Sequence, residues 1–137
     1  MPILTTDAAL TAVLRASKTI AIVGMSDRQH RDSFRIGEYL LDQGYTIIPV
    51  NPGIRSALGI PAVAQLEDIP TPIDMVNIFR RPEFVPDIVA SAIALHIRSV
   101  WMQLGVGHQE AAARAASAGM SVVIERCIMI EHRRLHP

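Results

Sequence analysis

Arginine residues gather at two places in the sequence where they would suit the binding of phosphate groups. One apolar segment, 19–24, is followed by Arg28, Arg31 and Arg35. Another, 73–79, is followed by Arg80 and Arg81. A guanidinium group presents a planar fork of N–H donors, so several that converge on one crevice indicate a ligand with more than one phosphate. For Arg28 and Arg31, a solvated position on the surface is an equally open interpretation.

The turn before Arg28 offers a second feature for anions. Gly24 permits a sharp turn, and Ser26, with the N–H groups ahead of a helix over 32–43, would bind an anion at the helix N-terminus. A glycine that ends a strand and a serine that caps a turn explain the same residues without a ligand. This short fragment leaves both interpretations open.

The nucleotide signatures of other α/β proteins are missing from this turn. The NAD pattern G-x-G-x-x-G has Ser26 and Gln29 at its second and third glycine positions. Asn51 and Pro52 stand where an acidic residue would bind the ribose, although Arg55 is a candidate contact for NADP. The phosphate-loop pattern G-x-x-x-x-G-K-[ST] is also absent, which argues against nucleoside triphosphate chemistry.

Gln103 and Cys127 are the remaining candidates for chemistry. The Gln103 amide could bond a base edge or an amide of the ligand, or could be an ordinary loop residue. Cys127 follows Arg126 and precedes a short helix, which would favour a thiolate, although a buried small hydrophobe is the favoured interpretation. His132 has no partner at metal-ligand spacing, and no convincing acid–base pair is present. We predict no catalytic residue and no metal site.

The elements that must position these residues alternate between strand and helix. Short, nearly continuous apolar runs predict buried parallel strands over 19–24, 45–50, 73–79, 98–103 and 120–125. Helical spacing and capping residues predict helices over 6–17, 32–44, 82–96, 108–119 and 127–135. The link after the second strand, rich in Pro and Gly, predicts a loop with one short helical turn.

This alternation predicts an α/β fold: a three-layer, doubly wound, Rossmann-like parallel sheet of strand order 3-2-1-4-5, with an N-terminal helix. Residues 1–137 are expected to form one domain. A switch point then lies beside the first strand, and ligands of such sheets bind at the carboxyl ends of the strands. The candidate contacts all follow predicted strands.

Composition narrows the class of ligand and the compartment. The 137 residues carry a formal net charge of zero and are 4% aromatic, so no basic field exists for nucleic acid. Cys127 is the single cysteine, which fits a reducing compartment. No apolar run approaches the ~20 residues that span a bilayer, and the N-terminus is unlike a signal peptide. We expect a cytoplasmic protein with no membrane or nucleic-acid partner.

Five motifs in order give the chain a resemblance to the small stand-alone CoA-binding proteins, relatives of the nucleotide-binding domain of the succinyl-CoA synthetase alpha subunit. These motifs are KTIAIVGMS, SFRIGEYLLDQGYTIIPVNP, IDMVNIFRRPEFVPDIV, VWMQLGV and ERCIMIEHRRL. The resemblance implies a Rossmann-like fold with coenzyme A as ligand. Contacts from Ser33, Arg35, Val50, Phe79, Arg80 and Arg81 are implied, beside the strand-end candidates Gly24, Ser26, Asn51, Pro52 and Gln103.

Coenzyme A would also explain the missing NAD features, because an acid after the second strand would repel its 3′-phosphate. The chain departs from the synthetases in lacking extra glycines and a lysine in the turn, and Asp32 stands where a proline is common in the stand-alone proteins. The phosphorylated histidine of the synthetases belongs to a second domain without a counterpart in these residues, so ligase activity is not implied.

The favoured prediction is a CoA- or acyl-CoA-binding protein that is non-catalytic or regulatory. One alternative is an enzyme: an NAD(P)-dependent oxidoreductase, or a CoA-thiol or acyl-transfer catalyst that uses Cys127. The other is a subunit that lends a CoA site to a partner ligase. The sequence identifies no protein partner.

Overall fold

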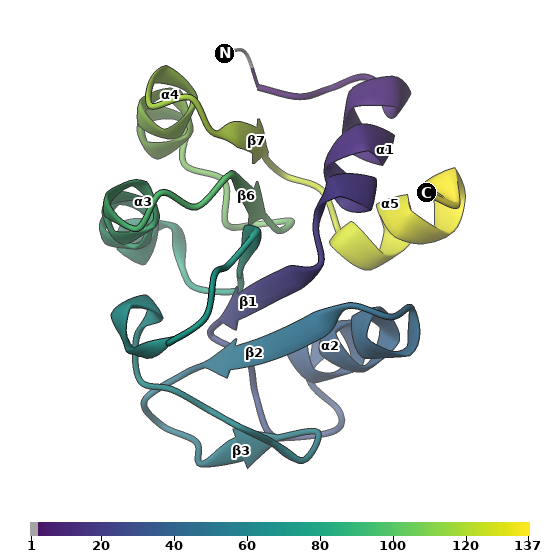
Figure 1. Ribbon diagram of the computed structural model, residues 1–137, viewed down its shortest axis with the longest axis vertical. Coiled ribbons are helices and arrows are strands. Elements are labelled where there is room, and N and C mark those ends of the chain that lie inside the picture. Colours follow the sequence, from purple (N-terminus) through teal and green to yellow (C-terminus); the bar gives the residue numbers. More distant parts are fainter. Residues whose placement is uncertain (1–2) are drawn as a thin grey trace.

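A parallel sheet lies between two layers of helices in the computed structural model, which describes residues 3–137 (Figure 1). Its strands are β1 (Thr19–Val23), β2 (Thr46–Val50), β5 (Met75–Ile78), β6 (Ser99–Met102) and β7 (Ser121–Val123). The helices are α1 (Asp7–Ala16), α2 (Asp32–Asp42), α3 (Val85–Ala94), α4 (Gln109–Ser117) and α5 (Ile128–Leu135). The predicted fold class is therefore confirmed.

The strand order is β2-β1-β5-β6-β7, which differs from the predicted 3-2-1-4-5. The third strand along the chain, β5, pairs with β1 and leaves β2 at the edge of the sheet. Pro49 lies within β2 and has no N–H to donate to a second neighbour, so an edge position is the one that this strand tolerates. The switch point now lies between β1 and β5.

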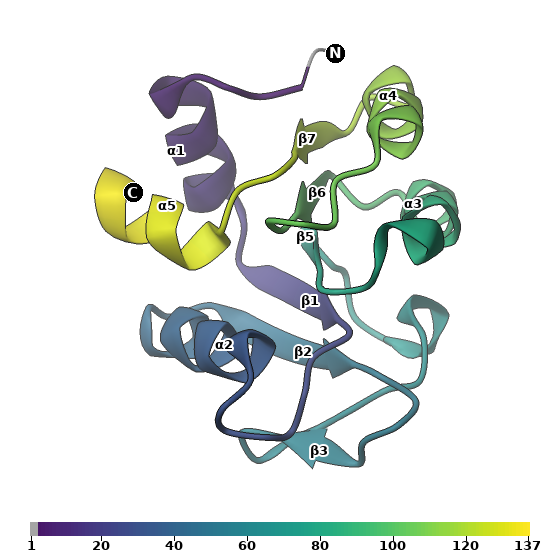
Figure 2. The same cartoon turned by 180° about the vertical axis from the view of Figure 1, so that it is seen from behind.

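The sheet buries side chains on both faces because successive residues of each strand point in opposite directions. Ile20 and Ile22 pack with α1, α2 and α5, whereas Ala21 and Val23 pack with α3 and α4. Figures 1 and 2 show these two groups of helices on opposite sides of the sheet. Trp101 of β6 is fully buried, and its Nε1 donates to the Arg126 carbonyl at 2.8 Å.

The helix predictions hold, with one refinement. Thr6 caps α1, since its Oγ1 accepts from the Ala9 N–H at 3.2 Å. The predicted helix over 82–96 begins as a 3₁₀ turn, η2 (Pro82–Phe84), and continues as α3. Within the described part of the chain, no helix is both long and apolar enough to cross a bilayer.

The link between β2 and β5 contains more structure than its sequence predicted. The expected short turn is η1 (Leu66–Asp68), but an antiparallel pair, β3 (Ser56–Ala57) and β4 (Ile60–Pro61), precedes it. Val63 then lies against the free edge of β2, where its N–H donates to the Pro49 carbonyl at 3.0 Å. At the opposite edge, the Leu4 N–H donates to the Val122 carbonyl of β7 at 2.8 Å.

Candidate functional site

Three neighbouring hollows follow the carboxyl ends of the strands, where the sequence candidates were expected. We call them the Arg80 pocket, the loop cleft and the Cys127 cleft. Their volumes are about 290, 690 and 340 Å³ respectively. The loop cleft and the Cys127 cleft share Asp32 and Phe79, and the residues next to Gly24 and Phe79, namely Val23 and Arg80, line the Arg80 pocket. The three hollows therefore lie side by side, and we call them together the depression.

Gly24 directly follows β1 and lies against the residues that follow β5. Its φ is +87°, a conformation that residues with a side chain rarely adopt. A Cβ at this position would lie 2.6 Å from the Phe79 carbonyl oxygen and 3.0 Å from Cδ of Arg80. Only glycine fits this turn, and its small size lets the ends of β1 and β5 form one surface.

The loop cleft is lined by the turn from Gly24 to Ser33. Within it the Ser33 Oγ accepts from the Ser26 N–H at 2.9 Å, and the Ser26 Oγ accepts from the Arg28 N–H at 3.0 Å. Ser33 is buried, so both serines hold the turn in shape. The α2 helix begins here without a side-chain cap, and its first N–H groups are left for a ligand.

The charges around the loop cleft are mixed. Arg28 and Arg31 are exposed and line it, in agreement with a local anion site. Arg35 instead pairs with Asp32 at 3.1 Å, and both side chains are mostly exposed. Positive charge in this cleft therefore comes from Arg28, Arg31 and the α2 N-terminus, with Asp32 and Asp27 opposing it.

Asn51 ties the turns after β1 and β2 together. Its Nδ2 donates to the Met25 carbonyl at 3.0 Å, and its Oδ1 accepts from the Gly53 N–H at 2.8 Å. Both ends of the amide are therefore engaged within the protein. Asn51 shapes the wall of the loop cleft, while the adjoining Pro52 lines the Arg80 pocket.

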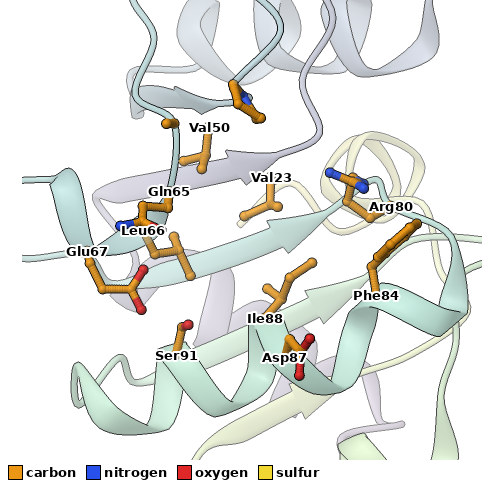
Figure 3. Close-up of a pocket in the computed structure, with 12 residues that line it drawn as sticks. Val23, Val50, Gln65, Leu66, Glu67, Arg80, Phe84, Asp87, Ile88 and Ser91 are labelled. Carbon is orange, nitrogen blue, oxygen red and sulfur yellow. The ribbon is translucent and has the colours of Figure 1, made fainter.

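The Arg80 pocket lies between α3 and the segment that carries η1 (Figure 3). Val23 and Val50 form its apolar floor at the ends of β1 and β2. The Arg80 guanidinium lies over the Phe84 ring, with its Cζ 4.3 Å from the ring centroid. Arg81 does not line this pocket; it is exposed, with its Nε 3.7 Å from an Oε1 of Glu83.

The Cys127 cleft lies beyond Phe79, between α2 and the start of α5. Gln103 and Cys127 both line it, and both are at least nine-tenths buried. The Gln103 Oε1 accepts from the Ile128 N–H at 2.9 Å and from Asn77 Nδ2 at 3.0 Å. Gln103 thus caps α5 and links it to β5.

The structure brings most of the sequence candidates to the depression and separates one from it. The residues that line a hollow are Gly24, Ser26, Ser33, Arg35, Val50, Asn51, Pro52, Phe79, Arg80 and Gln103. Sequence reasoning missed Phe84, which stacks with Arg80, and Asn77, which holds Gln103. An amide inside the apolar run IDMVNIF was the available signal for Asn77, because buried strand residues are rarely polar.

Several groups outside the three hollows have shifted pKa values and hold segments of the fold together. They are Asp7, Tyr45, Asp74, Glu131, His132 and Arg134. Arg134 of α5 hydrogen-bonds Glu131 and Asp7 of α1, both at 2.9 Å, and lowers the pKa of each carboxyl. Burial lowers the pKa of His132, whose Nδ1 lies 2.8 Å from the Tyr39 hydroxyl.

Comparison with known proteins finds relatives that match nearly the whole of this chain. A Bacillus subtilis (strain 168) protein named YneT is 40% identical over 125 residues, which cover 91% of this chain and 93% of YneT. A structure described as a hypothetical protein from Pyrococcus horikoshii OT3 is 34% identical, with a TM-score of 0.94 over 100% of this chain and 98% of that one. The structure of cell-free ID.343 from Thermus thermophilus is 38% identical, with a TM-score of 0.90 over 96% and 99% of the two chains.

A more distant likeness extends to a larger enzyme. An acetyl-coenzyme A synthetase from Ca. Korarchaeum cryptofilum shares the fold at 22% identity and a TM-score of 0.69, and the match covers 80% of this chain and 27% of that one. Residues 18–133 match the family model described as the CoA binding domain. The fold, the depression at the strand ends and these matches agree with the sequence resemblance, and the chain belongs to the CoA-binding domain family.

Proposed function

We propose that this protein binds coenzyme A, free or acylated, along the depression at the carboxyl ends of the strands. The arrangement of three hollows side by side is the observation that carries the proposal. Coenzyme A has a nucleotide, a diphosphate and a pantetheine arm in sequence, and a row of three hollows offers one place to each. The protein acts by binding its ligand and not by catalysis.

The diphosphate lies in the loop cleft in this proposal. The uncapped N–H groups of α2 bind its oxygens, and Arg28 and Arg31 add charge from the turn. Gly24 removes the side chain that would keep the ligand away from the backbone. Asp32 opposes the phosphates, although Arg35 neutralises part of its charge.

The adenosine end lies in the Arg80 pocket. Its base packs on Val23 and Val50, and the carboxylates of Glu67 and Asp87 offer acceptors for the exocyclic amino group (Figure 3). Arg80 then contacts the 3′-phosphate from above Phe84. A stacked arginine loses little freedom on binding, so this contact suits a phosphate at the edge of the pocket.

NAD fits the same depression less well. Its second ribose and base need a site for a nucleoside, and its adenosine ribose needs a carboxylate after β2. Asn51 occupies that place, and both ends of its amide are engaged by Met25 and Gly53. The ribose hydroxyls would therefore meet a neutral amide, already bonded within the protein, in place of a carboxylate.

The side chains that line the depression support binding without catalysis. Its carboxylates, such as Asp27, Asp32 and Glu67, are exposed to solvent, whereas acid–base catalysis commonly uses buried groups.

Calorimetric titration of the ligand-stripped protein tests the proposal, with CoA, dephospho-CoA and NAD compared at one salt concentration. We expect CoA to bind with a Kd near or below about 1 μM, equivalent to roughly 8 kcal/mol. Dephospho-CoA should bind about tenfold more weakly, since one charged hydrogen-bonding group is lost. If CoA does not bind, the proposal is wrong. If NAD binds more tightly than CoA, an oxidoreductase is favoured.

Paired variants separate the local site from general charge. Arg28→Gln with Arg31→Gln should weaken CoA binding and reduce its dependence on salt. Arg114→Gln removes a positive charge from the exposed side of α4, remote from the depression, and serves as the control. An equal loss in the control would show that net charge, and not the loop cleft, attracts the ligand.

A further inference from the structure

We propose that the Cys127 cleft receives the thioester and acyl group of an acyl-CoA with a short, uncharged acyl chain. In this arrangement Gln103 Nε2 donates to the thioester carbonyl. The inference rests on the proposed function, because it requires the nucleotide half of the ligand to lie in the other two hollows. It specifies the chemical class of ligand that the same site prefers.

The orientation of the Gln103 amide is the first observation. A backbone nitrogen can only donate, so the atom that faces the Ile128 N–H at 2.9 Å must be Oε1. The other amide atom, Nε2, is left without a partner among residues 3–137, although Gln103 is only 5% exposed and lines the cleft. Because Gln103 lines the cleft, this donor is available there, and a ligand carbonyl supplies an acceptor for it.

The apolar rim of the cleft is the second observation. Leu104 is 58% exposed and Ile130 is 52% exposed, the highest values for large hydrophobic residues in the described chain. Single exposed leucines are ordinary, but Leu104 on the loop after β6 and Ile130 in the first turn of α5 border one cleft. Their side chains would be covered by an apolar group that enters beside Cys127.

The size and charge of the cleft define the acyl group. Its volume of about 340 Å³ is near the lower limit for ligand pockets, which favours a chain of a few carbons. Asp32, which also lines the cleft and lies 3.1 Å from Arg35, would repel a carboxylate on the ligand. An uncharged acyl chain therefore suits the cleft better than a dicarboxylic one.

The rim is held in place before any ligand binds. The carboxylate of Glu125 accepts from the Gly107 N–H at 2.7 Å and from the Gly105 N–H at 3.2 Å. These bonds begin at the residue after Leu104 and fix the loop that follows β6. A preformed rim loses little freedom on binding, so burial of the acyl chain contributes directly to affinity.

Calorimetric titration with CoA, acetyl-CoA, butyryl-CoA and succinyl-CoA tests the inference. Affinity should rise from CoA to butyryl-CoA by about threefold to fourfold for each methylene that is buried. Succinyl-CoA should bind more weakly than butyryl-CoA. If CoA binds and butyryl-CoA binds no more tightly, the inference is wrong and the proposed function stands; if neither binds, the proposed function itself fails.

Variants locate the effect within the molecule. Leu104→Ser and Ile130→Ser should each reduce the ratio of butyryl-CoA to CoA affinity, whereas Leu95→Ser, another exposed leucine, should leave it unchanged. Gln103→Glu keeps an acceptor for Ile128 and removes the unpaired donor, so the ratio should fall about fivefold. If Gln103→Glu weakens the binding of CoA and of butyryl-CoA by the same factor, the carbonyl contact is disproved.

Discussion

Replacement of Gly24 by alanine tests whether the close approach of β1 and β5 shapes the site. The added Cβ would lie 2.6 Å from the Phe79 carbonyl oxygen and 3.0 Å from Arg80 Cδ, both too close for undisturbed structure. Alanine must also adopt a φ of +87°. The substitution therefore combines a backbone penalty with a steric one.

The two penalties can be assigned separate magnitudes. A residue with a Cβ in the left-handed region costs about 1–2 kcal/mol. Separation of packed groups to admit a methyl costs about 1–3 kcal/mol more. We expect Gly24→Ala to lower the free energy of unfolding by about 2–5 kcal/mol, a large share of the ~5–15 kcal/mol typical of a domain.

Gly44→Ala provides the matched control. Gly44 has a φ of +98°, but a Cβ there would meet nothing within 4 Å, so only the backbone penalty applies. Urea denaturation of both variants measures the difference, which should be about 1–3 kcal/mol. CoA affinity should fall about tenfold or more in Gly24→Ala alone. Equal destabilisation of the two variants would refute the argument that close approach requires glycine at position 24.

Asp32→Asn should tighten CoA binding about twofold to fivefold at low salt, because it removes a carboxylate from the α2 N-terminus and frees Arg35. Calorimetric titration measures the change, and weaker binding would contradict the prediction. The free energy of unfolding should fall as pH drops below about 6.5, since burial lowers the pKa of His132 and protons bind the unfolded chain more readily. Urea titrations of His132→Gln should show a flatter pH dependence between about pH 7 and 5. CoA disulfide should modify Cys127 by thiol–disulfide exchange. The Cys127 thiolate attacks one sulfur of CoA disulfide, a Cys127–CoA disulfide forms, and one CoA thiolate leaves. Mass spectrometry detects the adduct, and Cys127→Ser is the control. If Cys127 stays unmodified at a saturating concentration of CoA disulfide, the CoA sulfur lies elsewhere.

The alternation of apolar strands and amphipathic helices was sufficient to predict the layers of the fold. The order of the strands was not, because it depends on where a crossover returns to the sheet. Pro49 was the available clue, since a proline inside a strand indicates an edge position and so excludes a central β2. The β3–β4 pair was missed because two-residue strands leave almost no periodic signal.

The site was predictable in position but not in the direction of its side chains. Gly24 and Arg80 were placed at the carboxyl ends of strands from the sequence pattern alone. Whether a polar side chain there faces outward or inward depends on neighbours from distant segments. Asn51 turns to the Met25 carbonyl and Gln103 to the start of α5, and neither partner is adjacent in sequence.

The segments that border the outer strands also affect how copies of this protein meet. An open strand edge presents unpaired N–H and C=O groups on which another chain can extend the sheet. Here Val63 covers the end of β2 and Leu4 pairs with β7, so both edges are partly occupied by the protein's own backbone. Strand-to-strand aggregation is thereby disfavoured, and loss of the residues around Leu4 would open one edge to self-association.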